Sequence, residues 1–169
     1  MIRLYLGGER SGKSALALRA FLADPGPHLV VATGKARDPG FRAQILDHRR
    51  SRPAGLRVAE AGDDLPEVLA RGLAGARAVL VDSLDFWLYA CRGREQERTA
   101  ALLEVLGRAG DAAVTLVSCE VGLGPVAADS ATRAFVRGLG GLNQAVAGRA
   151  DRVFLAVAGR ALSLPSAAE

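Results

Sequence analysis

The sequence predicts a three-layer α/β domain with a mainly parallel sheet, and three observations lead to this prediction. Short apolar runs typical of buried strands alternate with longer segments of helical periodicity along the chain. A glycine-rich segment, residues 7–14, lies between the first such run and the first helical segment. No internal repeat or long linker divides the 169 residues, so we expect a single domain over residues 1–169.

The individual elements follow from apolar runs, turn residues and helix-end signals. Strands are predicted at residues 2–6, 28–32, 56–60, 77–81, 112–117 and 152–158, with a short last strand at 161–164. Helices are predicted at residues 13–22, 41–50, 63–74, 83–91, 95–109 and 131–147. Pro53 ends the second helix because the residue before a proline avoids the α region. Gly138, Gly140 and Gly141 are expected to weaken the last helix.

The composition favours a soluble protein with a hydrophobic core of its own. Half of the residues are hydrophobic and 24% are charged, an ordinary balance for a domain of this length. No apolar run approaches the roughly 18 residues of a membrane span, and the N-terminus enters a strand without signal-peptide anatomy. Cys91 and Cys119 are too few for a disulfide or metal framework. We therefore expect a cytoplasmic protein with no membrane span.

The net charge of +4 comes almost wholly from arginine. Such a surface favours phosphate-rich ligands, and it follows equally from Arg- and Ala-rich codon usage. Aromatic residues make up 5% of the chain and no basic stripe alternates with them. The sequence therefore predicts no nucleic-acid partner.

The segment Gly7-Gly8-Glu9-Arg10-Ser11-Gly12-Lys13-Ser14 has the pattern G-x-x-x-x-G-K-S, which binds the phosphates of nucleotides. Its glycines let backbone N–H groups turn toward a polyphosphate, Lys13 reaches the outer phosphates, and the Ser14 hydroxyl takes a place on Mg²⁺. The following helix directs its positive N-terminal end at the same anion. The pattern is expected by chance only about 0.002 times in a chain of this composition. The sequence therefore predicts a nucleotide-binding protein.

Polar side chains follow several predicted strands at their carboxyl ends, where ligands bind in parallel sheets. Thr33, Asp82 and Glu120 fall at this edge together with the glycine-rich segment. Asp82 follows Ala-Val-Leu-Val, the pattern of a Walker B strand whose carboxylate orients Mg²⁺, and the alternative is a cap for the next helix. For Glu120, activation of a hydroxyl, metal binding and helix capping all stay open.

His48 is one of two histidines in the chain. On the helix predicted there it lies on the face of Phe41 and Ile45, because residues at positions i, i+4 and i+7 align. A packed histidine beside a solvated basic run explains this spacing. The functional alternative is a neutral imidazole that attacks phosphorus while Arg49 and Arg52 hold the charged oxygens.

Several motifs, taken together and in order, resemble one enzyme family. They are Gly7-Gly8-x-Arg10-Ser11-Gly12-Lys13-Ser14, Ala32-Thr33, Asp38, His48-x-x-x-Arg52-Pro53, Val79-Leu80-Val81-Asp82-x-Leu84 with Trp87, Ser118-x-Glu120-Val121-Gly122-Leu123-Gly124, Arg133-x-Phe135, Gly141-x-Asn143-Gln144 and Ala150-Asp151. The family is bifunctional adenosylcobinamide kinase/adenosylcobinamide-phosphate guanylyltransferase, and the resemblance runs nearly end to end. It implies a P-loop NTPase fold of the RecA-like type and a homotrimer.

The resemblance implies two reactions at one nucleotide site. ATP or GTP phosphorylates the hydroxyl of adenosylcobinamide, and GTP then passes GMP through a guanylylated histidine to give adenosylcobinamide-GDP. His48 matches that histidine, Lys13 and Glu120 are the other expected catalytic residues, and Ser14 and Asp82 are the expected Mg²⁺ ligands. The expected nucleotide contacts are Gly7, Gly8, Glu9, Arg10, Ser11, Gly12, Lys13, Ser14, Thr33, Arg49, Arg52, Glu60 and Asp82.

The chain departs from the family pattern at several positions, which affect the expected kinase half and corrinoid contacts more than the nucleotide site. Two rival functions therefore stay open: a plain P-loop small-molecule kinase, and a nucleotide-binding module without turnover. The departing positions are Gly40-Phe41, Gln44, Asp47, Cys119, Ala127-Ala128 and Gly138.

Overall fold

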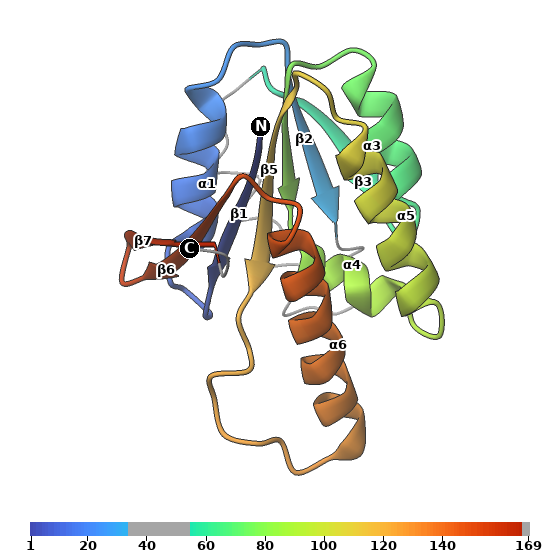
Figure 1. Ribbon diagram of the computed structural model, residues 1–169, viewed down its shortest axis with the longest axis vertical. Helices are drawn as coiled ribbons and strands as arrows, with labels where there is room; N and C mark the ends of the chain where they lie inside the picture. Colours follow the sequence, from blue (N-terminus) through green and yellow to red (C-terminus); the bar gives the residue numbers. More distant parts are fainter. Residues whose placement is uncertain (34–54, 167–169) are drawn as a thin grey trace.

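The computed structural model describes residues 1–33 and 55–166 of the chain. Within these residues a seven-stranded sheet has the order β3-β2-β4-β5-β1-β6-β7 (Figure 1). Only β7 runs antiparallel to its neighbour, and the other paired strands are parallel. The strands are β1 (Ile2–Gly7), β2 (His28–Thr33), β3 (Arg57–Ala61), β4 (Ala78–Asp82), β5 (Ala113–Cys119), β6 (Arg152–Val157) and β7 (Arg160–Leu164).

Helices cover both faces of the sheet, which confirms the predicted three-layer arrangement. The helices are α1 (Lys13–Leu22), α3 (Leu65–Leu73), α4 (Leu84–Ala90), α5 (Glu95–Gly107) and α6 (Ser130–Ala147). Helix α1 lies on one face, where Ala17 and Phe21 are buried against Tyr5 and Val30. The remaining helices pack on the other face, and their core includes the fully buried Trp87. Burial of apolar surface in these two layers is the main stabilising term for such a fold.

The predicted elements agree with the described ones to within about two residues at most ends, which is the usual uncertainty of helix and strand boundaries. The apolar runs of β4 and β5 are buried almost throughout, as expected for central parallel strands. Helix α6 is uninterrupted in spite of its glycines, because Leu139, Leu142 and Val146 are buried along one side of it. The predicted helix at residues 41–50 lies outside the described residues.

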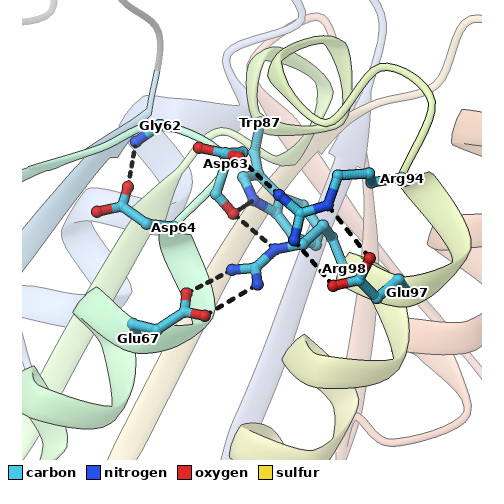
Figure 2. Close-up of polar contacts among 8 residues, drawn as sticks. All are labelled: Gly62, Asp63, Asp64, Glu67, Trp87, Arg94, Glu97 and Arg98. Carbon is cyan, nitrogen blue, oxygen red and sulfur yellow. Dashed lines mark hydrogen bonds and ion pairs between the residues drawn. The ribbon is translucent and has the colours of Figure 1, made fainter.

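An ion-pair network joins helices α3 and α5 to the turn that follows β3 (Figure 2). The buried Arg98 guanidinium donates two hydrogen bonds to the Glu67 carboxylate and one of 2.9 Å from Nε to the Asp63 carbonyl. Trp87 Nε1 donates to the same carbonyl at 3.3 Å. Arg94 pairs with Glu97 and Asp63 at the exposed side of this group. The network therefore fixes the turn after β3 against two helices of the covering layer.

The parallel strands direct their carboxyl ends toward the lower end of Figure 1, and the connection from β5 to α6 extends beyond that edge. Among the described residues, no helix combines the length and the apolar character that crossing a bilayer requires.

Candidate active site

The loop that leads from β1 to α1 contains two glycines, Gly7 and Gly12, that are required by close packing. Gly12 has φ +90°, and a Cβ on it would lie 2.9 Å from Gly159 Cα in the turn between β6 and β7. A Cβ on Gly7 would lie 2.4 Å from Ser11 Oγ and 2.7 Å from the Ala156 carbonyl oxygen. Gly12 therefore excludes a side chain for both steric and conformational reasons, and Gly7 excludes one for steric reasons alone.

The turn between β6 and β7 holds this loop in place. The Gly159 amide donates a hydrogen bond of 2.8 Å to the Ser11 carbonyl, and the Ser11 amide donates to the Gly8 carbonyl at 3.3 Å. Gly8, Glu9 and Arg10 form the exposed part of the loop. Arg10 has φ 53°, in the left-handed region that non-glycine residues seldom adopt.

Lys13 begins α1 and folds back over the loop. Its Nζ donates a hydrogen bond of 3.2 Å to the Gly8 carbonyl. The ammonium group thus lies beside the backbone that, in loops of this pattern, surrounds a polyphosphate. Together with the positive end of the ten-residue helix α1, it gives the loop the electrostatic character of an anion site.

Ser14 and Asp82 lie together at the start of α1 and the end of β4. Ser14 Oγ donates a hydrogen bond of 3.3 Å to Asp82 Oδ1. A hydroxyl and a carboxylate are the hard oxygen donors that Mg²⁺ prefers, so the two residues fit that ion. The alternative role of Asp82 as a helix cap is not supported, because Ser83 occupies the N-cap position of α4.

Thr33, at the end of β2, uses its hydroxyl within the fold. Thr33 Oγ1 accepts a hydrogen bond of 2.7 Å from the Ser83 amide and donates one to the Ser83 carbonyl. The residue is 4% exposed. Thr33 therefore fixes the turn that follows Asp82 by joining it to the neighbouring strand.

Glu120 follows β5 directly and lies beside the phosphate loop. Its amide donates a hydrogen bond of 3.0 Å to the Gly7 carbonyl. Its carboxylate turns back along its own loop, where Oε1 accepts from the Gly122 amide at 2.9 Å. In this structure the carboxylate is thus part of the turn after β5.

Asn143 of α6 fixes the strand end that carries Glu120. The buried Asn143 side chain accepts a hydrogen bond of 2.7 Å from Ser118 Oγ and donates one of 3.0 Å to the Cys119 carbonyl. The oxygen and the nitrogen of the Asn143 side chain each have a hydrogen-bond partner, which is the expected state of a buried polar side chain. The motif residue Asn143 therefore has a positioning role at this edge.

Cys119 and Asp85 form a pair that the sequence did not reveal as part of the site. Cys119 is opposite Gly7 in the β1–β5 register. Burial, the largest cause, and the Asp85 carboxylate both raise the pKa of its thiol, the Lys13 ammonium opposes them, and the net result is a pKa of about 11. Cys119 therefore lies close to both charged groups. The sequence carries only a weak indication that Asp85 belongs to this site. It is an acid three residues after Asp82, in the first turn of a helix, where acidic residues are common because they stabilise the helix.

The remaining predicted residues are placed as follows. Glu60 lies on β3 in register with Ala32, which is in turn opposite Asp82 on β4, so these positions share one row of the sheet. His48, Arg49 and Arg52 lie outside the described residues. Within the described parts of the chain, no group of three His, Cys, Asp or Glu side chains is arranged to hold a metal ion.

A parallel sheet with a phosphate loop after β1 and a carboxylate beside the loop serine defines a P-loop nucleotide-binding protein. The family described as cobinamide kinase / cobinamide phosphate guanyltransferase, CobU, matches residues 3–164, and the chain belongs to this family. It is a bifunctional enzyme of adenosylcobalamin biosynthesis that uses nucleotide and cobinamide substrates.

Two relatives match almost the whole chain. The bifunctional adenosylcobalamin biosynthesis protein CobP of Pseudomonas aeruginosa is 38% identical over 166 residues, with 95% of each chain covered. The bifunctional adenosylcobalamin biosynthesis protein CobU of Salmonella typhimurium is 32% identical over 176 residues, covering 94% of this chain and 97% of that protein. The family resemblance of the sequence motifs is thereby confirmed.

Solved structures support the fold. A prototypical ATPase from the type III secretion system of pathogenic bacteria has a TM-score of 0.55 at 14% identity, and the P4 protein of bacteriophage phi6 in complex with ADP has 0.50 at 18%. The match to the secretion-system ATPase covers 91% of this chain and 50% of that protein. The match to the P4 protein covers 95% of this chain and 52% of that protein. The likeness confirms the predicted P-loop NTPase architecture.

Proposed function

We propose that the enzyme works through a guanylylated histidine, His48, at a single nucleotide site built on the loop of residues 7–14. The observation that carries this proposal is the phosphate loop with Lys13 over it, at the strand edge that also carries Asp82 and Glu120. The sequence match of His48-x-x-x-Arg52-Pro53 to the family motif supplies the nucleophile.

In the first reaction, the hydroxyl of adenosylcobinamide attacks the γ-phosphorus of ATP or GTP, and the nucleoside diphosphate leaves. Lys13 and the loop amides oppose the negative charge that moves to the leaving oxygen. Ser14 and Asp82 would hold Mg²⁺, which when bound neutralises charge on the phosphate oxygens.

In the second reaction, neutral His48 attacks the α-phosphorus of GTP and pyrophosphate leaves. The same loop holds that leaving group, and Arg49 and Arg52 balance the charge on the α-phosphate. The phosphate of adenosylcobinamide phosphate then attacks the guanylylated histidine, which releases the imidazole and forms adenosylcobinamide-GDP.

The test follows both products with the intact chain. Incubation with adenosylcobinamide, GTP and Mg²⁺ should give adenosylcobinamide phosphate and then adenosylcobinamide-GDP, separated by chromatography and identified by mass. Omission of Mg²⁺ should suppress both. Formation of the phosphate alone would favour a plain kinase, and GTP binding without any product would favour a module without turnover.

Two further parts of the proposal concern assembly and location. The resemblance supports a homotrimer, which light scattering of the purified chain measures directly. Dependence on nucleoside triphosphates supports action in the cytoplasm.

A further inference from the structure

The side chain of Thr33 is bound to the backbone of Ser83, the residue that follows Asp82. Thr33 Oγ1 accepts a hydrogen bond of 2.7 Å from the Ser83 amide and donates one to the Ser83 carbonyl. Thr33 is 4% exposed and Ser83 is 5% exposed. The Thr33 hydroxyl therefore has its partners within the fold, which argues against a direct contact with a nucleotide.

The Thr33 hydroxyl extends the contact between β2 and β4 by one residue. The register of these two strands ends with Ala32 opposite Asp82. Thr33 is itself in register with Ala61 of β3, on the other side of β2. The hydroxyl therefore joins the peptide that follows Asp82 to a strand that is paired on both sides.

Ser83 is the residue at which the chain turns from β4 into α4. Its backbone is extended, with φ −141° and ψ 163°, and its carbonyl also accepts a hydrogen bond of 3.3 Å from the Trp87 amide. The peptide between Asp82 and Ser83 is planar, so fixing it restricts the backbone dihedral ψ of Asp82. The direction of the Asp82 side chain is restricted with it.

The Asp82 carboxylate must be placed accurately because it works together with Ser14. Ser14 Oγ donates a hydrogen bond of 3.3 Å to Asp82 Oδ1, and this pair of oxygens fits Mg²⁺. Mg²⁺ requires nearly ideal octahedral geometry, so a small displacement of one oxygen lowers the affinity for the ion. Groups that hold a metal ligand in place typically contribute about 10–100-fold to metal affinity.

We propose that Thr33 is a positioning residue that holds the Asp82 carboxylate in the orientation needed for Mg²⁺, an inference that rests on the proposed function. Thr33 acts through the Ser83 peptide and touches neither the metal nor the nucleotide. Without the hydroxyl, the buried Ser83 amide loses this acceptor, which is costly, and the peptide is expected to turn toward another partner. This role differs from the nucleotide contact that the sequence predicted for Thr33.

The experiment measures metal binding directly, with Mn²⁺ as the probe and saturating GDP. In Thr33→Val, which keeps the branched shape and removes the hydroxyl, the Kd for Mn²⁺ from electron paramagnetic resonance should rise about tenfold. Thr33→Ser keeps the hydroxyl and should stay near the wild-type value. The Kd for GDP in EDTA should be the same in all three proteins, because the loop of residues 7–14 is unaltered.

Thr115→Val is the matched control. Thr115 is fully buried on β5, and within the described residues its Oγ1 has no hydrogen-bond partner. The same substitution there removes a buried threonine hydroxyl that does not bind the Ser83 peptide. The Kd for Mn²⁺ should therefore stay at the wild-type value.

An unchanged Kd for Mn²⁺ in Thr33→Val, or an equal rise in Thr115→Val or Thr33→Ser, would overturn the inference. A loss of GDP affinity in EDTA would instead assign Thr33 a direct contact with the nucleotide. Thr33→Ala is the second variant without the hydroxyl, and if neither variant folds, Thr33 is structural and the inference is wrong. If the wild-type chain with GDP binds no Mn²⁺, the metal part of the proposed function is itself wrong.

Discussion

The Gly159 amide donates a hydrogen bond of 2.8 Å to the Ser11 carbonyl, so residues almost 150 positions apart in the chain set the shape of the phosphate loop together. Gly12 lies at the same contact, where a Cβ would meet Gly159 Cα at 2.9 Å. The β6–β7 turn is therefore part of the nucleotide site, although it belongs to the last two strands of the sheet.

This contact predicts the effect of Gly12→Ala. The new Cβ requires both a shift of the β6–β7 turn and a strained φ of +90°, so the free energy of unfolding should fall by about 1–3 kcal/mol. GTP affinity should fall as well, because the loop amides are displaced. Urea unfolding and a fluorescent-nucleotide titration measure the two effects.

Gly8→Ala is the matched control for stability, because a Cβ there has no atom within 4 Å and its φ is not in the left-handed region. Its free energy of unfolding should equal that of the wild type. An equal loss in both variants would show that the contact with Gly159 does not constrain the loop.

A second prediction concerns the ion-pair network of Figure 2. Arg98→Met keeps the apolar stem but removes the hydrogen bonds to Glu67 and to the Asp63 carbonyl. Breaking a fully buried pair costs about 3–5 kcal/mol, and since Glu67 is half exposed we expect about 2 kcal/mol.

Arg108→Met tests the same change at an exposed pair with Glu104, where both side chains are more than half exposed. Its effect on the free energy of unfolding should be below about 1 kcal/mol. Equal effects of the two substitutions in urea unfolding would contradict a stabilising role for the buried guanidinium.

A third prediction concerns pH. The hydrogen bond from Arg98 holds the pKa of the Glu67 carboxyl below its usual value of 4.5. The folded state therefore binds this proton less readily than the unfolded state, and the stabilisation is present above pH 4.5 and lost as pH falls through the lowered pKa. Wild type should exceed Glu67→Gln in Tm at pH 7, and the difference should shrink below pH 4.5.

Glu104→Gln is the control, because Glu104 belongs to the exposed pair with Arg108. Its Tm should stay near that of the wild type at both pH values. A Tm difference for Glu67→Gln that is constant from pH 7 to below 4.5 would show that the charge on Glu67 has no part in it.

The sequence predicted the parts of the molecule that depend on local pattern. The phosphate loop and the β4 run ending at Asp82 could be located because glycine spacing and continuous apolar runs have direct structural meaning. The same local rules suggested that glycines weaken α6, but burial of Leu139 and Leu142 against the sheet side supports that helix.

Long-range pairing could not be read from the chain. Arg98 lies near the start of α5 among other charged residues, and its hydrogen-bond partner Glu67 is 31 positions away in the chain. Asp85 resembles an ordinary acid in a first helical turn, yet its Oδ1 is buried in the folded chain. Burial of these polar groups is a property of the assembled layers, so no local signal specified it.

We propose that GTP held by the phosphate loop transfers its GMP to His48. The most direct measurement is incubation of the chain with GTP labelled at the α-phosphate, followed by denaturation and detection of label on the protein. We predict acid-labile, base-stable label that His48→Ala abolishes, while His28→Ala, which removes the other histidine, retains it. Absence of label on the wild-type chain, or label that persists in His48→Ala, would contradict the account.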